Sequence, residues 1–361
     1  MSNSRADGDN TGGPAMNMRG DLTQGPILRT LFLFSMPTLL SNSLQSLNGT
    51  INAIWVGRLI GEKALAATAN ANIIMFLLSS AAFGFGMAGT VRIGQRYGAR
   101  DLDGARRTMG TAMGFCFGVT VVIAITGWIT TPWLLTLLAT PEDAFQLALD
   151  YLRMIFISMP LVMISIILTM GLRGAGDART PLIFMAVTVV LHTAINPLLI
   201  VGYGPFPAMG ISGSALSLII ASLASFLGML AYVYAKDLPL RLRGIELAYL
   251  KPRREELGFI VAKGFPMGAQ MFVMSAAGLI VIGLVNREGI LTTAAFGASM
   301  QVFTYIQMPA MAIGGAISAM AAQFIGAGKW ERIDELTRAG LVTNGVLTGV
   351  LTVLILLFGR P

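Results

Sequence analysis

The chain is dominated by long apolar runs that recur from one end to the other, with most of the charge in short segments between them. Hydrophobic residues make up 55% of the sequence, charged residues 12%, and the mean hydropathy is +0.72. About 20 apolar residues cross a bilayer core as a helix, so the sequence predicts an all-α integral membrane protein. Nine spans are predicted, at residues 31–57, 64–91, 109–137, 147–172, 181–202, 211–235, 259–285, 292–322 and 340–358.

Positive charge divides unevenly between the two sides that nine spans create. Twenty of the 25 Lys and Arg residues fall in the N-terminal tail and in the loops after even-numbered spans. By the positive-inside rule, this asymmetry predicts a cytoplasmic N-terminus and an external C-terminus. The net charge of +7 is thus a mark of topology, and we expect no nucleic-acid partner.

The sequence matches itself at an offset of 228 to 229 residues. The segment QRYGA (95–99) aligns with QFIGA (323–327), and Pro37 aligns with Pro266. The first unit holds six spans, an even number, so the second begins on the same side of the membrane and the repeat is parallel. We therefore predict two pseudo-symmetric helical lobes, with a complete six-helix N-lobe and an incomplete three-helix C-lobe. The alternatives are a natural short form and a truncated product.

Composition divides the chain into four parts. Residues 1–26 are rich in Gly, Asn and Asp and are predicted to form a disordered cytoplasmic tail. Residues 27–240 form the predicted N-lobe, residues 241–258 a basic cytoplasmic linker between the lobes, and residues 259–361 the partial C-lobe.

One face of the first span is polar. Ser41, Gln45, Asn48 and Asn52 follow one another at spacings of four, three and four, which is one helical face. Polar side chains within a membrane turn toward the bundle interior or a water-filled cavity. Hydrogen bonding between packed helices is the simpler alternative.

The fifth span carries His192, the only histidine in the chain, with Asn196 one turn away. At ~1.5 Å rise per residue, Asn196 lies at nearly the same depth as Asn52, and His192 lies level with Asn48 one turn deeper. If the two helices face each other, the four residues form a polar cluster in the outer half of the first lobe. Ser214 and Ser217, near the outer start of the sixth span, could join it.

Four segments resemble the multidrug and toxic compound extrusion (MATE) family, in particular its bacterial branches. They are WVGRLIGEKALAA (55–67), GLRGAGDARTP (171–181), INPLLIVGYG (195–204) and MGISGSALSLII (209–220). The resemblance covers roughly residues 27–358. It implies two six-helix lobes that open alternately to either side of a bacterial inner membrane, and export of small organic compounds against an inward flow of protons or sodium ions.

In related transporters the first lobe holds a cation-coupling site built around an Asp in the first span and an Asn-x-x-x-Asp-Pro segment in the fifth. Here these positions hold Asn52 and the segment His192-Thr-Ala-Ile-Asn196-Pro197, and no Asp or Glu lies in the interior of a predicted span. A neutral amide does not titrate and is a weaker partner for a hard cation, which puts sodium binding in doubt.

The polar cluster predicted from the sequence comprises His192, Asn196, Asn52, Asn48 and Gln45. An unperturbed imidazole titrates near about pH 6.5, so His192 is the candidate proton carrier. The alternative is a neutral, hydrogen-bonded histidine with no transport role.

Pro37 and Pro266 lie inside predicted spans, where proline removes a backbone hydrogen bond and bends a helix. In MATE-like proteins, bending of the first span is tied to the state of the coupling site, so both prolines are predicted to be helix-bending residues. The alternative is that neighbouring groups satisfy the freed carbonyls.

The second half presents flexible thioethers and amides that suit a promiscuous apolar cavity. The predicted substrate-cavity residues are Met267, Gln270, Met271, Met274, Gln301 and Thr304. Ordinary helix packing is the alternative for these methionines.

The leading prediction is a secondary active exporter that is driven by a proton or sodium gradient, uses no cofactor and is a monomer. No P-loop, metal cluster or nucleophile arrangement appears in the sequence, so we predict neither ATP-driven transport nor an enzyme. Two alternatives stay open, a lipid-linked substrate flippase of the same superfamily and a truncated, non-transporting membrane protein.

Overall fold

The computed structural model describes residues 20–137, 142–202, 207–285 and 290–358, which are helical throughout apart from turns and short connections. This confirms the all-α class. The helices are α1 (Ile27–Leu59), α2 (Glu62–Gly98), α3 (Leu102–Leu137), α4 (Glu142–Gly174), α5 (Arg179–Val201), α6 (Gly210–Ala235), the short 3-10 helix η1 (Gly244–Leu250), α7 (Arg254–Val285), α8 (Ile290–Gly326) and α9 (Glu331–Phe358).

Each predicted span coincides with one long helix, but most helices are longer than the span. Helix α9 begins at Glu331, whereas the apolar run begins near residue 340. Hydropathy detects only the apolar part of a helix, and the helical backbone continues into polar turns. In these polar turns, ion pairs such as that between Asp103 and Arg107, one turn apart on α3, stabilise the helix.

Among the described residues, seven helices, α3 to α9, are long and apolar enough to cross a membrane. Helix α1 has 33 residues but is not in this set. Its polar face is the physical reason, because Ser41, Gln45, Asn48 and Asn52 lower its hydropathy.

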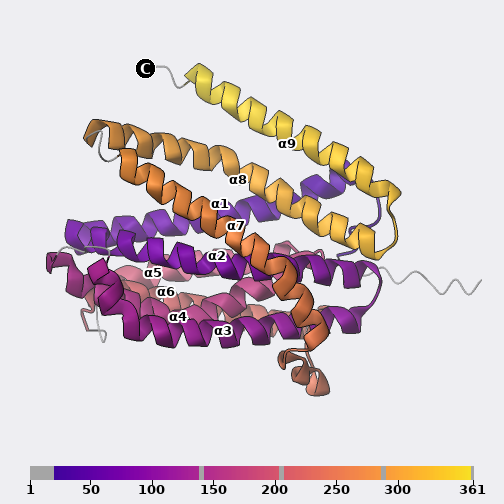
Figure 1. Ribbon diagram of the computed structural model, residues 1–361, viewed down its shortest axis with the longest axis horizontal. Helices are drawn as coiled ribbons and strands as arrows, with labels where there is room; N and C mark the ends of the chain where they lie inside the picture. The colour runs from indigo at the N-terminus through magenta and orange to yellow at the C-terminus, as the bar shows by residue number, and fades with distance from the viewer. Residues whose placement is uncertain (1–19, 138–141, 203–206, 286–289, 359–361) are drawn as a thin grey trace, which may run out of the picture.

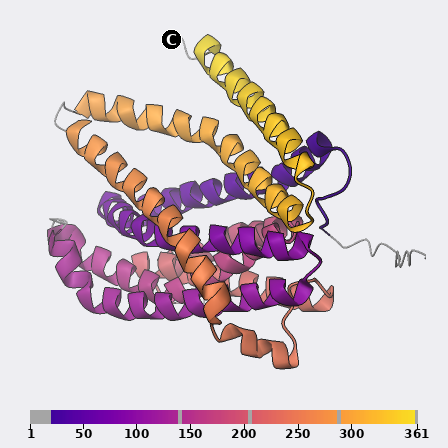
Figure 2. The ribbon, with the colours of Figure 1, turned by 45° about the vertical axis from the view of Figure 1, so that its right-hand side comes forward.

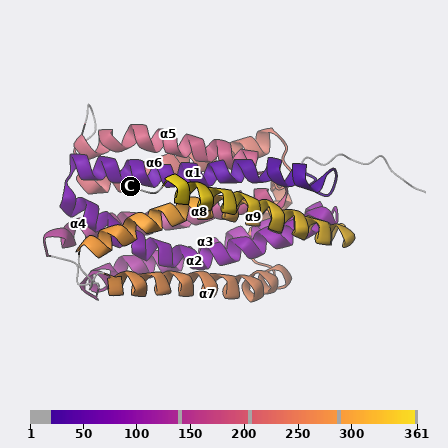
Figure 3. The same cartoon turned by 90° about the horizontal axis from the view of Figure 1, so that it is seen from above.

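Helices α1 to α6, which we call the first lobe, pack around α4, whose neighbours are α2, α3 and α6. Helix α5 lies between α6 and α1. Helices α7 to α9, which we call the second lobe, lie over α1 and α2, with α7 crossing α2 and α9 outermost on α8 (Figures 1 and 3).

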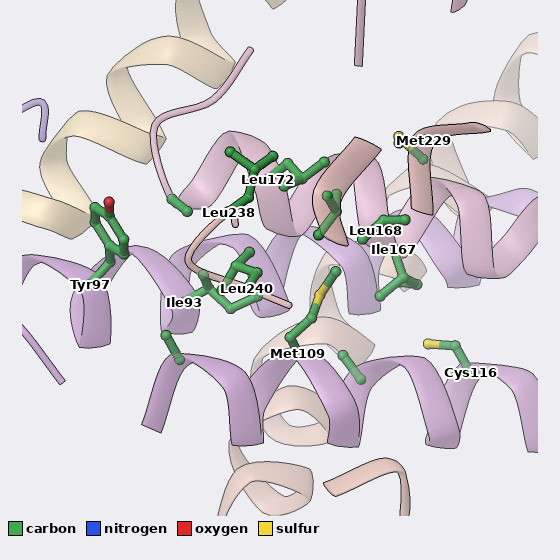
Figure 4. Close-up of a cluster of buried hydrophobic side chains, with 14 of the residues drawn as sticks. Ile93, Tyr97, Met109, Cys116, Ile167, Leu168, Leu172, Met229, Leu238 and Leu240 are labelled. Atoms are coloured by element: carbon green, nitrogen blue, oxygen red, sulfur yellow. The ribbon is translucent and has the colours of Figure 1, made fainter. Parts of the chain in front are cut away.

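A cluster of buried side chains joins α2, α3, α4 and α6 of the first lobe to the segment after α6 (Figure 4). Met109 of α3 and Leu172 of α4 are 1% exposed and lie at its centre, and Cys116 is buried at its edge. Such packing, more than the hydrophobic effect, holds helices together in a membrane. The cluster joins four helices of the first lobe, and Ile260 of α7 belongs to it as well.

Three turns with Lys or Arg in them or beside them, such as Arg100, Arg173 and Lys329, gather at one end of the bundle, which we call the basic end. It comprises the α2–α3 turn (99–101), the α4–α5 turn (175–178) and the α8–α9 turn (327–330). Figure 2 shows α7 and α8 converging with the first lobe toward this end and diverging from it toward the opposite end. At the crossing of α2 with α7, a Cβ on Gly84 would overlap the backbone of Gly264 and Gly268, so the absence of a side chain permits the close approach.

A reciprocal contact joins α2 and α8 at the basic end. A Cβ on Gly98 would overlap the backbone of Gln323, and a Cβ on Gly326 would overlap the backbone of Gln95. These are the four residues that the internal match pairs at an offset of 228. The sequence repeat is therefore visible in the structure as a contact that each half makes with the other in the same way.

Two polar segments outside the predicted spans are packed against the helices. Residues 20–26 are not disordered, because Leu22 is 7% exposed and its backbone N–H donates to the side chain of Gln323. The predicted linker 241–258 is structured as well, since it contains η1 and the first turn of α7. Composition missed both because these segments are polar and still packed. Residues 1–19 lie outside the described part of the chain.

Candidate functional site: a buried polar cluster between α1, α5 and α6

Helix α5 directs its two polar residues into the first lobe. His192 is 2% exposed and Asn196 is fully buried, while Val190 on another face of the same helix is 67% exposed. The sequence produces this arrangement because the outward positions of α5 are apolar and suit lipid, and the polar pair lies one turn apart on the inward face.

The polar residues of α1 and α5 form two hydrogen-bonded pairs. Asn48 Oδ1 lies 2.8 Å from His192 Nδ1, and Asn196 Nδ2 donates to Asn52 Oδ1 at 2.9 Å. Both pairs have the same sequence separation of 144 residues, as two parallel helices in register require. The structure thus brings these four residues together at the depths that the helix rise predicts.

Two further helices contribute to the cluster through Asn52. Ser214 Oγ of α6 donates to Asn52 Oδ1 at 2.8 Å, and the buried side chain of Tyr151 on α4 lies close to the Asn52 side chain. Tyr151 is 3% exposed, and sequence reasoning missed it. Depth was the available signal, because Tyr151 lies about as far from the start of α4 as Asn52 lies from the end of α1.

The pairing with Asn48 defines the chemistry of the imidazole. With Asn48 Oδ1 as acceptor, Nδ1 carries the proton of the neutral ring and Nε2 is the basic nitrogen. His192 Nε2 is buried without a hydrogen-bond partner, although the Ser214 backbone lies against the ring. Asn196 Oδ1 and Thr193 Oγ1 are likewise buried and unpaired. The cluster therefore has unused capacity to accept a proton or a hydrogen-bond donor.

The cluster contains neutral groups only. No group of three His, Cys, Asp or Glu side chains that could hold a metal ion occurs within the described residues. Amide and hydroxyl oxygens alone bind a hard cation weakly, because such sites rely on carboxylates. The arrangement suits proton binding at the imidazole better than sodium binding.

Gln45, which was predicted to belong to the cluster, lies outside it. Its side chain is exposed, and among the described residues it has no hydrogen bond. At the helix register that pairs Asn48 with His192, the residue of α5 opposite Gln45 is Val189, which is buried and apolar. On the polar face of α1, only Asn48 and Asn52 therefore form hydrogen bonds with polar residues of α5.

The predicted helix-bending prolines lie in continuous helices. Pro37 is half-buried in α1, where its carbonyl oxygen accepts the Ser41 hydroxyl at 2.8 Å. Pro266 is exposed in α7. A role of either proline in bending stays a prediction.

The predicted substrate-cavity residues lie on α7 and α8. Met271 is half-buried, and the other five are exposed on α7 and α8. Two cavities, of about 300 and 460 Å³, lie instead at the basic end, and none of the six residues lines either cavity. Their role in substrate binding stays a prediction.

A buried ion-pair cluster at the basic end is the second feature that sequence reasoning missed. Glu256, in the first turn of α7, is 4% exposed and accepts hydrogen bonds from Arg92 Nε at 3.0 Å, Arg96 Nη2 at 2.8 Å and Thr108 Oγ1 at 3.0 Å. It therefore joins the second lobe to α2 and α3 of the first. The sequence places Glu256 in a charged linker, which hides its burial.

The chain is similar to a known protein family, to bacterial sequences and to solved structures. The MatE family model matches residues 37–198 and 266–361. The probable multidrug resistance protein YoeA of Bacillus subtilis (strain 168) is 37% identical over 334 residues, which are 92% of this chain and 72% of YoeA. A solved structure of a MOP superfamily transporter from Pyrococcus furiosus matches with a TM-score of 0.86 at 22% identity, covering 94% of this chain and 74% of that one. An outward-facing multidrug resistance MATE family transporter matches with a TM-score of 0.85 at 21% identity, covering 94% and 74% of the two chains.

Proposed function

The chain belongs to the MatE family, and on that premise we propose that it is a secondary active exporter of small organic compounds that is driven by an inward proton flow. Its relative YoeA is named a probable multidrug resistance protein, which supports export of chemically varied compounds. The protein is a multi-pass membrane protein with helices of the required length and apolarity.

The observation that carries the proton coupling is the imidazole of His192, buried in a cluster of neutral partners. Its Nδ1 is occupied by Asn48 and its Nε2 is free to accept a proton. Protonation at Nε2 makes the ring a cation whose Nδ1–H still donates to Asn48. Loss of that proton to the other side of the membrane restores the neutral ring. One proton is thus carried per cycle with no other group changing its charge.

Alternating access is the second part of the proposal. The two lobes lie close together at the basic end and diverge at the opposite end, near which His192 and Asn196 lie (Figure 2). The likeness to an outward-facing transporter supports the same form here. By the distribution of positive charge, the basic end faces the cytoplasm. In this form the cluster is close to the external side, from which the proton enters.

The test is export from proteoliposomes under an imposed pH gradient, measured with a panel of neutral and cationic fluorescent dyes. Replacing His192→Gln is expected to reduce pH-driven export to background, because a glutamine keeps a polar side chain but cannot titrate. Gln45→Ala is the matched control, since Gln45 is exposed and outside the cluster.

Export by His192→Gln at the wild-type level would remove His192 as the proton carrier while leaving the exporter intact. If the wild-type chain itself moves none of the dyes under either a proton or a sodium gradient, the non-transporting alternative takes the place of the whole proposal.

A further inference from the structure

The segment before α1 crosses from one lobe to the other at the basic end. Residues 20–25, which we call the strap, continue directly into α1 of the first lobe and lie between the α4–α5 turn and the α8–α9 turn. Asp21 orders the strap, because its Oδ1 accepts the backbone N–H of Thr23 at 2.9 Å and the Thr23 hydroxyl at 2.7 Å. The strap is polar and rich in glycine, and these hydrogen bonds within it fix the backbone around Asp21 and Thr23.

A single buried amide of α8 joins the strap to both lobes. Gln323 is fully buried, and its Oε1 accepts the backbone N–H of Leu22 at 2.9 Å. Its Nε2 donates to the backbone oxygens of Gly174 at 3.0 Å and Gly20 at 3.3 Å. In the part of the chain that the structure describes, the Gln323 side chain therefore bonds only to residues outside the second lobe, in the strap and at the end of α4. If these hydrogen bonds break, a buried amide is left unpaired.

The second lobe also holds the strap by apolar and ionic groups. Leu22 packs into a buried cluster that includes Ile313 and Phe324 of α8 and Leu336 of α9, together with apolar residues of α1. In the α8–α9 turn, Lys329 Nζ donates to the Thr23 oxygen at 3.0 Å. Arg332 at the start of α9 donates to the oxygens of Thr23 and Gly25 at 2.6 and 2.5 Å. The strap is thus joined covalently to the first lobe and by contacts to the second.

The repeat shows that this arrangement is not a by-product of the helix crossing. Gln95 is the repeat partner of Gln323, and it has no side-chain hydrogen bond within the described residues. The segment that precedes α7, the counterpart of the strap, lies elsewhere, with Tyr249 and Leu250 against Gly110 and Gly114 of α3. Only one of the two equivalent positions therefore carries a strap.

We propose that the strap and Gln323 form a latch that keeps the basic ends of the two lobes together, and that its release is a required step when that end opens. The proposal rests on alternating access as the proposed function. In opening, α8 moves away from the α4–α5 turn, so the bond from Gln323 to Gly174 must break. The strap must then either follow the second lobe or leave it.

The experiment measures the separation of the lobes and needs neither substrate nor gradient, so it stands even if the chain exports none of the dyes. Spin labels are placed at Lys236→Cys and Trp330→Cys, both exposed, with the buried Cys116 replaced by Ala. Distance distributions are recorded by double electron–electron resonance in lipid nanodiscs. Gln323→Ala is expected to raise the ratio of open to closed molecules about tenfold or more, because it removes buried hydrogen bonds that only the closed form makes.

Gln95→Ala is the matched control and is expected to leave the distribution unchanged, since it truncates the same side chain at the equivalent position. An equal shift in both variants would assign the effect to the helix crossing and overturn the latch. An unchanged distribution in Gln323→Ala would overturn it as well.

A second pair of changes covers the case in which Gln323→Ala fails to fold. The double variant Lys329→Ala, Arg332→Ala removes the hydrogen bonds from the α8–α9 turn and α9 to the strap, and it leaves Gln323 and the packing of Leu22 in place. Hydrogen exchange at the Leu22 amide is expected to become faster in this variant, together with a shift toward the open distances. Exchange and distances that both match the unchanged chain would contradict the proposal.

Discussion

At the scale of single residues, helix depth predicted which residues of the candidate site lie level with each other, on the condition that the two helices face each other. Asn48 with His192 and Asn52 with Asn196 are paired by depth, and the structure joins them by hydrogen bonds. Gln45 was assigned to the cluster because it shares a helical face with Asn48 and Asn52, but its side chain is exposed and the apolar Val189 lies at the opposing position of α5. Tyr151 was missed because no polar face marks its helix.

Asn52 is the residue at which the chemistry of the site can be changed with the least disturbance. Its Oδ1 accepts from both Asn196 Nδ2 and Ser214 Oγ, and an aspartate oxygen can accept the same two bonds. We expect Asn52→Asp to fold and to acquire sodium binding, because a carboxylate is the ligand that the cluster lacks. The measurement is thermal unfolding in detergent, with sodium chloride against potassium chloride.

Asn52→Ala serves as the comparison. It leaves two donors without an acceptor, at about 1 to 3 kcal/mol for each buried group, so its unfolding temperature should fall in either salt. A sodium response of the unchanged chain equal to that of Asn52→Asp would contradict this view of the site.

At the scale of elements, the apolar runs predicted nine helices and their order, but the polar ends had to come from the structure. Helices α7 and α9 begin earlier than their apolar runs, and η1 lies in a segment that composition marks as a charged linker. The reason is that a charged residue can be buried when it is fully paired, as Glu256 is. Single-residue hydropathy carries no information on pairing.

The adjacent residues Glu255 and Glu256 at the start of α7 allow a direct comparison of an exposed ion pair with a buried one. Glu256→Ala removes the buried carboxylate that Arg92 and Arg96 share and leaves them only exposed or half-buried partners such as Glu255, so we expect a loss of about 2 to 4 kcal/mol. The Glu255 side chain is 76% exposed, so Glu255→Ala should cost less than about 1 kcal/mol. Unfolding temperatures of the two variants, side by side, give the comparison. Equal losses would mean that burial of Glu256 does not strengthen the junction.

At the scale of the whole molecule, the count of positive charges predicts which end faces the cytoplasm, and the structure gathers most of those charges at the basic end. The packing of α7 over α2 could not be predicted from the sequence. It depends on the close approach of Gly84 to Gly264 and Gly268, and glycines of this kind are common throughout apolar runs.

Cysteine labelling tests the predicted orientation. Ala208, in the α5–α6 turn, and Lys236, after α6, are exposed at opposite ends of the bundle. A membrane-impermeant maleimide should label Ala208→Cys on intact cells and Lys236→Cys only after permeabilisation. The buried Cys116 of the unchanged chain should stay unlabelled in both cases. The reverse pattern would place the N-terminus outside.

The reciprocal crossing of α2 and α8 means that the two halves of the chain make the same contact with each other. Gly98 lies against Gln323, and Gly326 lies against Gln95, so an alanine at either glycine produces the same overlap. Gly98 and Gly326, 228 positions apart, are therefore under the same steric constraint. A saturation mutagenesis screen should find that both positions tolerate substitution equally poorly. A contact of this form is also available to a half-length chain pairing with its own copy.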